Sequence, residues 1–369
     1  MANQKLKIED LKSELLASNA TWVAAENEFT SLSESEMQKF LGFTPAPGEA
    51  SLMEREKQAL ASFAAFKVAK GAVGYPTTFD WRNVGGNNYV TSVKNQAACG
   101  SCVAFGAIAT TESTMRVLRG NPNLAIDFSE AHLFYCLGGS EGRKCGGANG
   151  GWWPENAFNK FRDVGVIPES AYPYTGGDQA CGAPANWQSM VTKISSYHAI
   201  TNAADMKNWL STRGPLAACF TVYNDFFAYS SGVYRHVSGA LAGGHCVCII
   251  GYSDTEQCWI AKNSWGTGFG QGGFFKIGYG QCGIDAKMHA VDGVVETGWN
   301  TNLHVQGLWS NESDRNVYVY LENLGWRKIS PDNDNIVINL LTLFADAKAN
   351  NRTVNVYLEN SIIKQVYSL

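Results

Sequence analysis

The segment Gln96-Ala-Ala-Cys99-Gly-Ser-Cys102-Val-Ala-Phe105 is the most informative stretch of the chain. A loop containing glycine turns here into an apolar segment with helical spacing, and Cys102 lies at the junction. A helix N-terminus favours negative charge, so a thiol at this position ionises more easily than an ordinary one. Three interpretations stay open: a reactive thiol, half of a structural disulfide, or a redox pair with Cys99. Against the redox pair, no Trp precedes the Cys-x-x-Cys and no short βαβ unit surrounds it.

His245 is the best base for such a thiol among the six histidines. Gly243 and Gly244 precede it and allow close backbone approach, and the apolar run at 246–252 predicts a strand that holds the ring. Asn263 ends the next apolar run, 18 residues further on. Two adjacent strands would bring His245 and Asn263 together, and an amide oxygen can orient an imidazole without taking its proton. The pattern predicts a nucleophile, a base and an orienting group.

These residues resemble the papain-like cysteine proteases, in which His and Asn follow the Cys by about 130–150 residues. Here the separations are 143 and 161 residues. The family usually has an aromatic residue directly after the nucleophile, and Val103 departs from this without removing a reacting group. Further matches follow in the family's order over 76–294: Phe79-Asp-Trp-Arg82, Phe128-Ser-Glu130, Asn149-Gly-Gly151, Tyr172-Pro-Tyr174, Gly214-Pro215 and Gly280-Gln-Cys282.

The resemblance implies a role for each reacting group. Cys102 would be the nucleophile, held as a thiolate by His245 as imidazolium. Asn263 would fix the imidazole ring, and Trp265 would shield their hydrogen bond from water. Gln96 would donate its side-chain amide, together with the Cys102 backbone N–H, to the developing oxyanion. The implied activity is hydrolysis of peptide bonds in protein substrates, with no cofactor and no metal.

Composition and texture divide the chain into three zones. Residues 1–75 are charged, Ala-rich and free of cysteine; residues 76–294 hold all ten cysteines; residues 295–369 again have none. In the central zone, helical patterns at Cys102–Arg119, Ser129–Leu137 and Pro154–Asp163 precede strand patterns at Leu216–Val222, His245–Tyr252, Cys258–Asn263 and Gly273–Tyr279. Helices first and strands second predict an α+β fold with segregated halves. The resemblance implies the papain-like two-subdomain fold, a helical half and a β-barrel-like half.

The resemblance also sorts the cysteines. It pairs Cys99 with Cys145 and Cys136 with Cys181, although Cys145 lies three residues before the family position. The other five are expected to be free and to act as small hydrophobic residues: Cys219, Cys246, Cys248, Cys258 and Cys282. The first ten residues show no apolar stretch typical of a signal peptide. The two disulfides nevertheless favour an extracytoplasmic or secreted protein.

The family's main substrate pocket maps onto several positions of this chain. The cleft would include Gly150, Gly151, Gly244 and Trp265, with Trp152, Trp153, Cys219 and Lys287 lining the pocket. Aromatic walls suit an apolar substrate side chain. Lys287 would favour an acidic one if it points inward. The alternative is that Lys287 points to solvent.

Residues 1–75 occupy the place of the family's inhibitory pro-segment. Ile8, Leu11 and Leu15 follow helical spacing, Ser33-Glu-Ser-Glu36 forms a capping box, and Met53–Ala69 is helical or extended. Asn27-Glu-Phe29 followed by Glu36-Met37 resembles the family's pro-segment motif. We expect a helical portion and then an extended stretch through the cleft, with acid-triggered or self-cleavage near Ala72-Val-Gly-Tyr75. The alternative is a purely structural N-terminal subdomain.

Residues 295–369 lie outside the resemblance. Arg315–Asn323 and Arg352–Asn360 are near repeats, each predicting a β-hairpin, with a helix at Leu340–Ala349 between them. The zone vaguely resembles small OB-like modules. Trp299, Trp309, Trp326 and Tyr318 are expected in its core, and a binding face made by them is the alternative. Such a module could bind glycan or another copy of the chain.

Charge limits the partners of the whole chain. The net charge is −4 and the basic residues are scattered, which argues against nucleic acid. No apolar run approaches the 18–20 residues of a membrane span. The expectation is a cysteine endopeptidase zymogen. Two alternatives stay open: a binding protein on a catalytically altered papain fold, and an acyl transferase or peptide ligase using the same acyl-enzyme.

Overall fold

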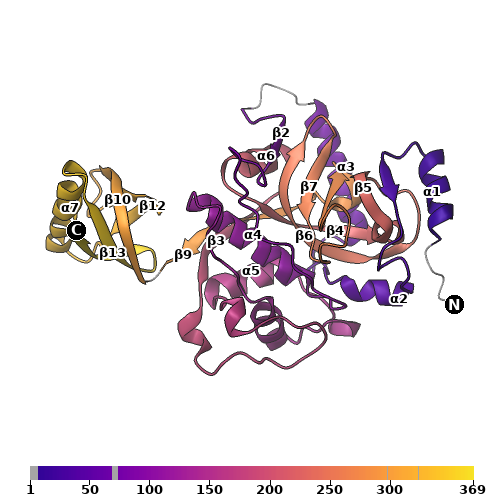
Figure 1. Ribbon diagram of the computed structural model, residues 1–369, viewed down its shortest axis with the longest axis horizontal. Helices are drawn as coiled ribbons and strands as arrows, with labels where there is room; N and C mark the ends of the chain where they lie inside the picture. Colours follow the sequence, from indigo (N-terminus) through magenta and orange to yellow (C-terminus); the bar gives the residue numbers. More distant parts are fainter. Residues whose placement is uncertain (1–6, 69–73, 297, 323) are drawn as a thin grey trace. The chain divides into compact units, whose positions relative to one another are not determined.

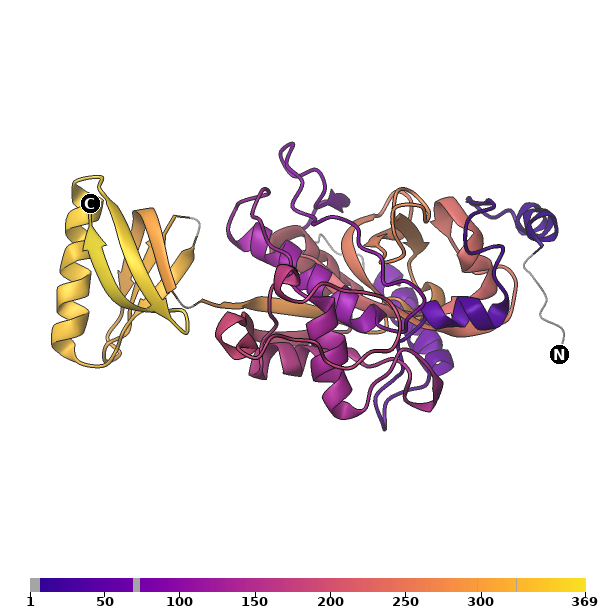
Figure 2. The same ribbon diagram turned by 60° about the horizontal axis from the view of Figure 1, so that its bottom comes forward.

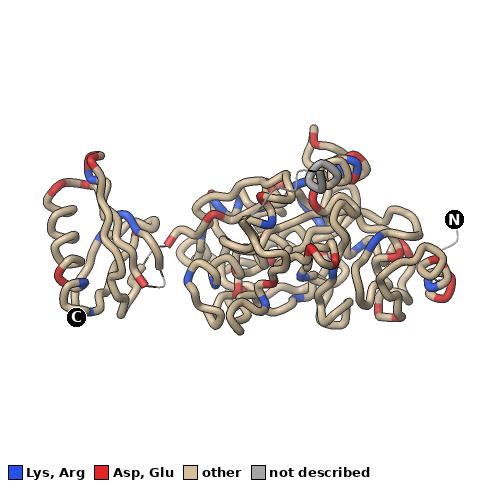
Figure 3. The backbone as a smooth tube through the Cα atoms, turned by 90° about the horizontal axis from the view of Figure 1, so that it is seen from above, with Lys and Arg blue, Asp and Glu red and all other residues tan. Residues whose placement is uncertain are grey.

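The computed structural model describes residues 7–68, 74–296, 298–322 and 324–369. The chain divides into two compact units. The first comprises 1–114 and 125–292, and the second comprises 115–124 and 293–369. Lys and Arg are interspersed with Asp and Glu along the traces of both units (Figure 3).

The described helices agree with most of the expected ones. The α-helices are α1 (Ile8–Ala17), α2 (Glu34–Met37), α3 (Leu52–Val68), α4 (Cys102–Leu118), α5 (Pro154–Asp163), α6 (Ala203–Thr212) and α7 (Asp334–Ala349). The short helices are η1 (Gln38–Phe40), the π-helix η2 (His132–Gly138), η3 (Gly139–Glu141), η4 (Gly147–Asn149), η5 (Glu169–Ala171), η6 (Trp187–Met190), η7 (Asn224–Ala228) and η8 (Gln281–Gly283). The expected helix at Ser129–Leu137 is thus largely this π-helix.

One sheet forms the strand half of the first unit. Its order is β1-β5-β8-β7-β6-β4-β9-β3, with β2 paired to β6. The bounds are β1 (Trp22–Ala24), β2 (Thr78–Asp80), β3 (Lys193–Ile200), β4 (Leu216–Tyr223), β5 (Tyr229–Tyr234), β6 (Leu241–Ser253), β7 (Cys258–Lys262), β8 (Phe274–Gly278) and β9 (Met288–Val295). All four expected strands are present, and α4 and α5 belong to a helical half (Figure 1), where Gly106 of α4 packs closely against Cys246 and Val247 of β6. This is the segregated α+β arrangement that the sequence predicts.

The N-terminal segment is built into the first unit. Strand β1 pairs with β5, so the segment extends the sheet at its edge. Ser33 and Glu36 form the expected capping box at α2. Phe29 is buried, and its ring lies 5.2 Å from that of Trp265. Helix α3 packs against η8, α6 and β4, on the strand half (Figures 1 and 2). Ala69 and the expected cleavage residues Ala72 and Val73 lie outside the described residues.

The second unit contains a small closed barrel. Its strand order is β10-β11-β12-β14-β13, and α7 lies between β12 and β13 in the sequence. The bounds are β10 (Gly298–Ser310), β11 (Val317–Leu321), β12 (Gly325–Ile329), β13 (Thr353–Glu359) and β14 (Ile362–Ser368). Both expected hairpins, β11–β12 and β13–β14, are confirmed. A five-stranded closed barrel with a helix before its fourth strand has the topology of the OB-fold.

Apart from Phe344, the barrel core is aliphatic, which corrects the expectation for its tryptophans. Val319, Leu321, Val354 and Phe344 are among its fully buried residues. Trp299, Trp309 and Trp326 are 48%, 46% and 48% exposed, and Tyr318 is half-buried. Strand β11 alternates Val317, Val319 and Leu321 with Tyr318 and Tyr320, so both faces carry apolar side chains. The smaller aliphatic set fills the narrow barrel, and the aromatic set is left outside.

The cysteines follow the pairing that the resemblance implied. Disulfides join Cys99 to Cys145 and Cys136 to Cys181. The other six, which are Cys102, Cys219, Cys246, Cys248, Cys258 and Cys282, are free and buried. No helix within the described ranges is both long and apolar enough to cross a membrane.

Candidate active site

Cys102 is the first residue of α4, and the loop before it is held by its own backbone. The Ala104 and Phe105 N–H groups donate to the Ser101 carbonyl, which closes the first turn. The thiol therefore lies at the positive end of the helix, as the sequence predicts. Cys102 has 0% exposure. Its burial comes partly from the N-terminal segment, because Gly42 of that segment packs against Gly100, two residues before Cys102.

His245 lies on β6 and Asn263 directly follows β7, the neighbouring strand. Asn263 Oδ1 accepts a hydrogen bond from the Ser264 backbone N–H at 2.8 Å, which identifies that atom as the oxygen. The same oxygen is 2.7 Å from His245 Nε2, so Nε2 must be the protonated nitrogen. His245 Nδ1 has no hydrogen-bond partner within the described part of the chain. The neutral ring thus keeps Nδ1 available as a base.

Trp265 covers the pair formed by His245 and Asn263. Its indole is fully buried, and its ring centroid lies 4.7 Å from that of His245. Phe227 stacks on the indole at 5.0 Å, nearly parallel to it. These rings exclude water from the His245–Asn263 hydrogen bond, which strengthens it electrostatically.

Burial controls the charge of the two reacting groups. Desolvation raises the pKa of the Cys102 thiol, and backbone hydrogen bonds from Cys246 and Gly42 offset only part of this. Desolvation lowers the pKa of His245 to about 4, against the opposing effect of its bond with Asn263. Both changes favour the uncharged forms. In this covered state burial therefore works against charge on both groups.

Gln96 presents its amide nitrogen to the N-terminal segment. Its Oε1 accepts a hydrogen bond from Ser264 Oγ at 2.7 Å, which fixes the orientation of the amide. Nε2 then donates to the Phe40 carbonyl at 3.0 Å and to the Cys99 carbonyl at 2.7 Å. A main-chain carbonyl of the N-terminal segment therefore occupies the donor that the sequence assigns to an oxyanion.

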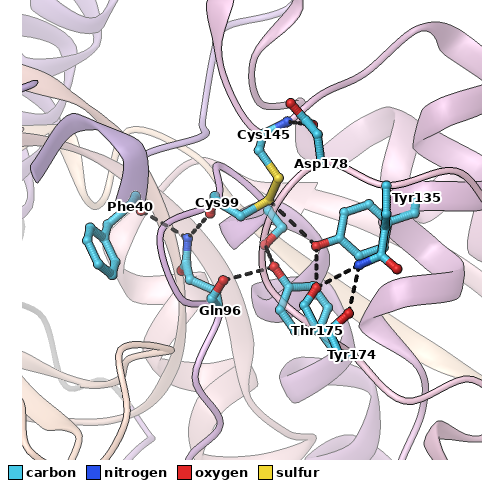
Figure 4. Close-up of a disulfide and its surroundings, with 10 residues drawn as sticks. Phe40, Gln96, Cys99, Tyr135, Cys145, Tyr174, Thr175 and Asp178 are labelled. Atoms are coloured by element: carbon cyan, nitrogen blue, oxygen red, sulfur yellow. Dashed lines mark hydrogen bonds between the residues drawn. A yellow bond between two sulfur atoms is a disulfide. The ribbon is translucent and has the colours of Figure 1, made fainter. Parts of the chain in front are cut away.

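The Cys99–Cys145 disulfide braces the loop that carries Gln96 (Figure 4). Gly100 N–H donates to the Cys145 carbonyl at 2.9 Å, and Cys145 N–H donates to Asp178 at 2.6 Å. Tyr174 bonds to Ser101 Oγ at 2.8 Å and donates to the Gln96 carbonyl at 2.9 Å. The loop that carries Gln96 is thereby held to Cys145 by the disulfide and to Tyr174 by hydrogen bonds.

Residues 41–44 of the N-terminal segment run through the cleft in extended form. Trp152 N–H donates to the Gly42 carbonyl at 2.7 Å, and Thr44 N–H donates to the Trp152 carbonyl at 3.0 Å. On the opposite wall, Gly42 and Phe43 N–H both donate to the Gly244 carbonyl, at 3.0 and 2.9 Å. The segment thus makes backbone hydrogen bonds with both walls, as an extended peptide would.

Glycines make this close approach possible. A Cβ on Gly151, whose φ is +75°, would collide with the Gly42 carbonyl, and a Cβ on Gly244 would collide with the Phe43 carbonyl. Gly42 itself lies against Gly100, beside the nucleophile. Gly151 and Gly244 were predicted from the sequence as cleft residues. Gly42 was not, although its position before the Pro45-Ala-Pro-Gly48 break was a usable signal.

The two tryptophans after Gly151 have different places. Trp152 offers its backbone to the cleft, while its fully buried indole turns away and donates to Glu141 at 2.9 Å. Trp153 is half-buried, and the Arg143 guanidinium lies 4.6 Å from its ring centroid. Gly150 lies just before, with its N–H bonded to Gly147. The expectation of two aromatic pocket walls is therefore wrong for the Trp152 side chain.

Lys287 points inward. Its Nζ lies 2.5 Å from Glu155 of α5 and also pairs with Glu49 of the N-terminal segment. These carboxylates raise the pKa of Lys287, although burial acts to lower it. Cys219 is buried on β4, directly opposite Cys246 on β6. The solvent-facing alternative for Lys287 is wrong in this state, because an acidic side chain already pairs with it.

Sequence reasoning missed Ser264, Glu49 and Glu155. Ser264 is adjacent to Asn263 and faces Gln96, so the Asn-Ser-Trp motif was a usable signal. Glu49 and Glu155 meet Lys287 across 238 and 132 residues, and no local pattern predicts such contacts.

Comparisons with known proteins agree with this geometry. A family model described as "Papain family cysteine protease" matches residues 75–291. The cathepsin L-like proteinase of Fasciola hepatica is 32% identical over 72% of this chain and 77% of its own length. Cathepsin B of Dictyostelium discoideum is 30% identical over 76% of this chain and 90% of its own length.

Solved structures of precursor forms are also similar. Procathepsin L2 from the Tenebrio molitor larval midgut superposes with a TM-score of 0.59 at 28% identity, covering 77% of this chain and 88% of that one. Procathepsin B S9 from Trypanosoma congolense gives a TM-score of 0.62 at 23% identity, covering 79% of this chain and 99% of that one. The second likeness supports the fold alone.

Proposed function

The chain belongs to the papain family of cysteine proteases, and we propose that Cys102, His245 and Asn263 are the groups with which it cleaves peptide bonds. It is a cysteine endopeptidase zymogen that acts on protein substrates, with its propeptide in the cleft. The observation that supports the residue roles best is the His245–Asn263 contact of 2.7 Å beside a helix-terminal thiol. Gln96 and the Cys102 backbone N–H are the proposed oxyanion donors.

The proposed reaction starts when the pro-segment leaves and water reaches the site. Cys102 then loses its proton to His245 Nδ1, and Asn263 stabilises the imidazolium through Nε2–H. The thiolate attacks the carbonyl carbon, and the oxyanion takes the place of the Phe40 carbonyl at Gln96 Nε2. The imidazolium gives its proton to the leaving amine. His245 then takes a proton from water, and the resulting attack releases the acid and the free thiol.

Removal of the nucleophile tests this assignment. We expect Cys102→Ala to lower peptide hydrolysis by the processed enzyme about 10⁴-fold or more, because no acyl-enzyme can form. Cys258→Ala is the matched control, since Cys258 is also a free buried thiol, and it should keep its kcat. Retained hydrolysis in Cys102→Ala would contradict the assignment. Adding a competing amine separates hydrolysis from acyl transfer, because a transferase would form mainly the amide product.

Lys287 gives the cleft a preference for an acidic substrate side chain. In the zymogen its partner from the pro-segment is Glu49, and release of the segment leaves Lys287 paired with Glu155 alone. A substrate carboxylate can then replace Glu49. Lys287 is only 19% exposed, so this pair is better shielded than a surface ion pair.

Paired substrates test this preference. We expect Lys287→Ala to lower kcat/KM about tenfold for a peptide with Glu at the pocket position, and to change the Leu peptide little. Lys276→Ala, which removes an ion pair with Glu256 away from the cleft, is the control. If the ratio of kcat/KM for the Glu peptide to kcat/KM for the Leu peptide were equal in wild type and Lys287→Ala, Lys287 would not determine the substrate preference.

The barrel is proposed to be an accessory binding module. Its half-exposed tryptophans favour the binding face over the alternative of a purely structural domain.

The two disulfides support a location outside the reducing cytosol, as the sequence predicts.

A further inference from the structure

Four aromatic side chains and one lysine lie on the same outer face of the barrel. In the strand register Tyr318 pairs with Trp309 on one side and with Lys328 on the other. Tyr320 pairs with Gly307 and with Trp326 in the same way. Positions two apart on a strand share a face, so these two rows form one surface across β10, β11 and β12. We name Trp309, Tyr318, Tyr320 and Trp326 the aromatic platform.

Gly307 makes room for the Trp326 ring within the platform, where Trp326 meets Tyr320 edge to face. A Cβ at Gly307 would be 3.1 Å from the outermost carbon of the Trp326 ring and 3.2 Å from the Tyr320 Cβ. The Trp326 indole therefore reaches from β12 across β11 to β10, and a side chain at 307 would push it away. Trp309 lies beside Tyr318 with a centroid distance of 5.6 Å, and Trp326 beside Tyr320 at 5.3 Å.

The platform occupies the face on which barrels of this topology bind ligands. OB-folds bind oligonucleotides and oligosaccharides over their second and third strands, which are β11 and β12 here. Exposed aromatic patches of this kind are uncommon on a protein surface without a binding role. The barrel core is complete without these side chains.

Charge distinguishes between the two kinds of ligand. Residues 293–369 contain eight Asp and Glu against six Lys and Arg. Most of the cations have carboxylate partners: Arg315 with Asp334, Arg327 with Glu296, Arg352 with Asp346, and Lys364 with Asp332. Among the described cations of this unit, Lys328 is the one recorded beside a platform ring, with its Nζ 5.9 Å from the Tyr318 ring centroid. A polyanion needs a positive groove. The described residues of the platform bring one cation, Lys328.

We propose that the aromatic platform binds a neutral polysaccharide and holds the protease on it. Trp and Tyr rings carry a negative face that attracts the weakly positive C–H groups of a sugar ring, and they supply large contact areas at low entropic cost. Trp309 and Trp326 lie in different cross-strand rows, so an extended chain can stack on both. The proposal names the ligand class of the accessory module proposed above and does not depend on catalysis.

The test uses full-length Cys102→Ala protein, which cannot process itself. Retention is measured on insoluble cellulose, on insoluble chitin and in native gels containing galactomannan. We expect binding to at least one of these three polymers, and at least a tenfold weaker affinity in Trp309→Ala/Trp326→Ala. The control is Trp299→Ala, which removes an equally exposed tryptophan that contacts Tyr357 and Tyr367 on β13 and β14 instead. Its affinity should stay within twofold.

A second variant leaves every aromatic side chain in place. Gly307→Val should weaken binding because it displaces the Trp326 ring, and unchanged thermal unfolding of the barrel would show that the fold is kept. Four results would overturn the proposal: no retention on any of the three polymers, equal losses in Trp299→Ala, tighter binding to a thymidine oligonucleotide than to the polymers, or a dimer in sedimentation that the double variant abolishes. Because catalysis is absent from this assay, its outcome is independent of the protease assignment.

Discussion

At the scale of single residues, the same two side chains change character with their surroundings. Cys102 and His245 are both 0% exposed beneath the pro-segment. Burial there raises the pKa of the thiol and lowers the pKa of the imidazole to about 4. Burial therefore favours the uncharged form of each group, and a neutral thiol is a poor nucleophile. Exposure to water removes the desolvation cost, after which each charge stabilises the other.

The stability of the covered state depends on pH, because burial changes the protonation of His245. The folded, covered state holds His245 with a pKa of about 4 against its ordinary 6.5, so it binds fewer protons than the opened state. Stability of the covered state is fully present above pH 6.5 and is lost as the pH falls towards 4. For this one group, the equilibrium constant that favours the covered over the opened state falls by up to roughly tenfold per pH unit across that window. Acid therefore favours release of the pro-segment.

Histidine NMR of the Cys102→Ala zymogen measures this directly. With ¹⁵N-labelled histidine, the His245 signal is assigned by its absence in Cys102→Ala/His245→Gln. We expect His245 to stay neutral down to about pH 4 in the zymogen. A His245 midpoint near 6.5 in the intact zymogen would contradict the account of a site neutralised by burial.

At the scale of elements, the reacting groups depend on how a loop, a helix and two strands are joined. The sequence predicted α4 and β7 to within one residue, because their apolar periodicity is strong and their ends carry clear signals. These elements were enough to predict the positions of Cys102, His245 and Asn263. The orientation of Gln96 did not, because it depends on Ser264 and on a disulfide to residue 145.

The two disulfides permit a matched comparison. Cys99–Cys145 and Cys136–Cys181 close loops of 46 and 45 residues, so loss of either should lower the free energy of unfolding by a similar amount, roughly 4 kcal/mol by loop entropy. Only the first braces the Gln96 loop. We expect Cys99→Ser/Cys145→Ser to lower kcat about tenfold or more at a temperature where it is folded, whereas Cys136→Ser/Cys181→Ser keeps kcat.

Denaturant unfolding and steady-state kinetics of both double variants check this expectation. Equal kcat values in the two variants would show that the Cys99–Cys145 disulfide stabilises the fold without positioning Gln96.

At the scale of the whole molecule, the sequence predicted the kinds of parts better than the contacts between distant segments. The pairing of Glu49 with Lys287 joins residues 238 apart, and no periodicity reveals it. The barrel strand β10 was missed because its register shifts near Asn300 and near Val305, which breaks the alternating pattern. The exposure of Trp309 and Trp326 was mispredicted because β11 is apolar on both faces, and only barrel closure decides which face is buried.

The pro-segment is the part that makes the molecule a zymogen. It extends the sheet through β1, packs Phe29 beside Trp265, places Gly42 over the nucleophile and pairs Glu49 with Lys287. Since these contacts lie on one continuous segment, each is made at a high effective concentration. The segment excludes substrate and water together.

The most direct test of this account is covalent labelling of Cys102 by a biotinylated epoxysuccinyl peptide, before and after the pro-segment is removed by acid. Peptide mapping by mass spectrometry identifies the labelled thiol, and Cys102→Ala is the control. We expect almost no label on the intact zymogen, then one label per molecule, on Cys102, after release. Full labelling of the intact zymogen, label on another thiol, or no label after release would contradict it.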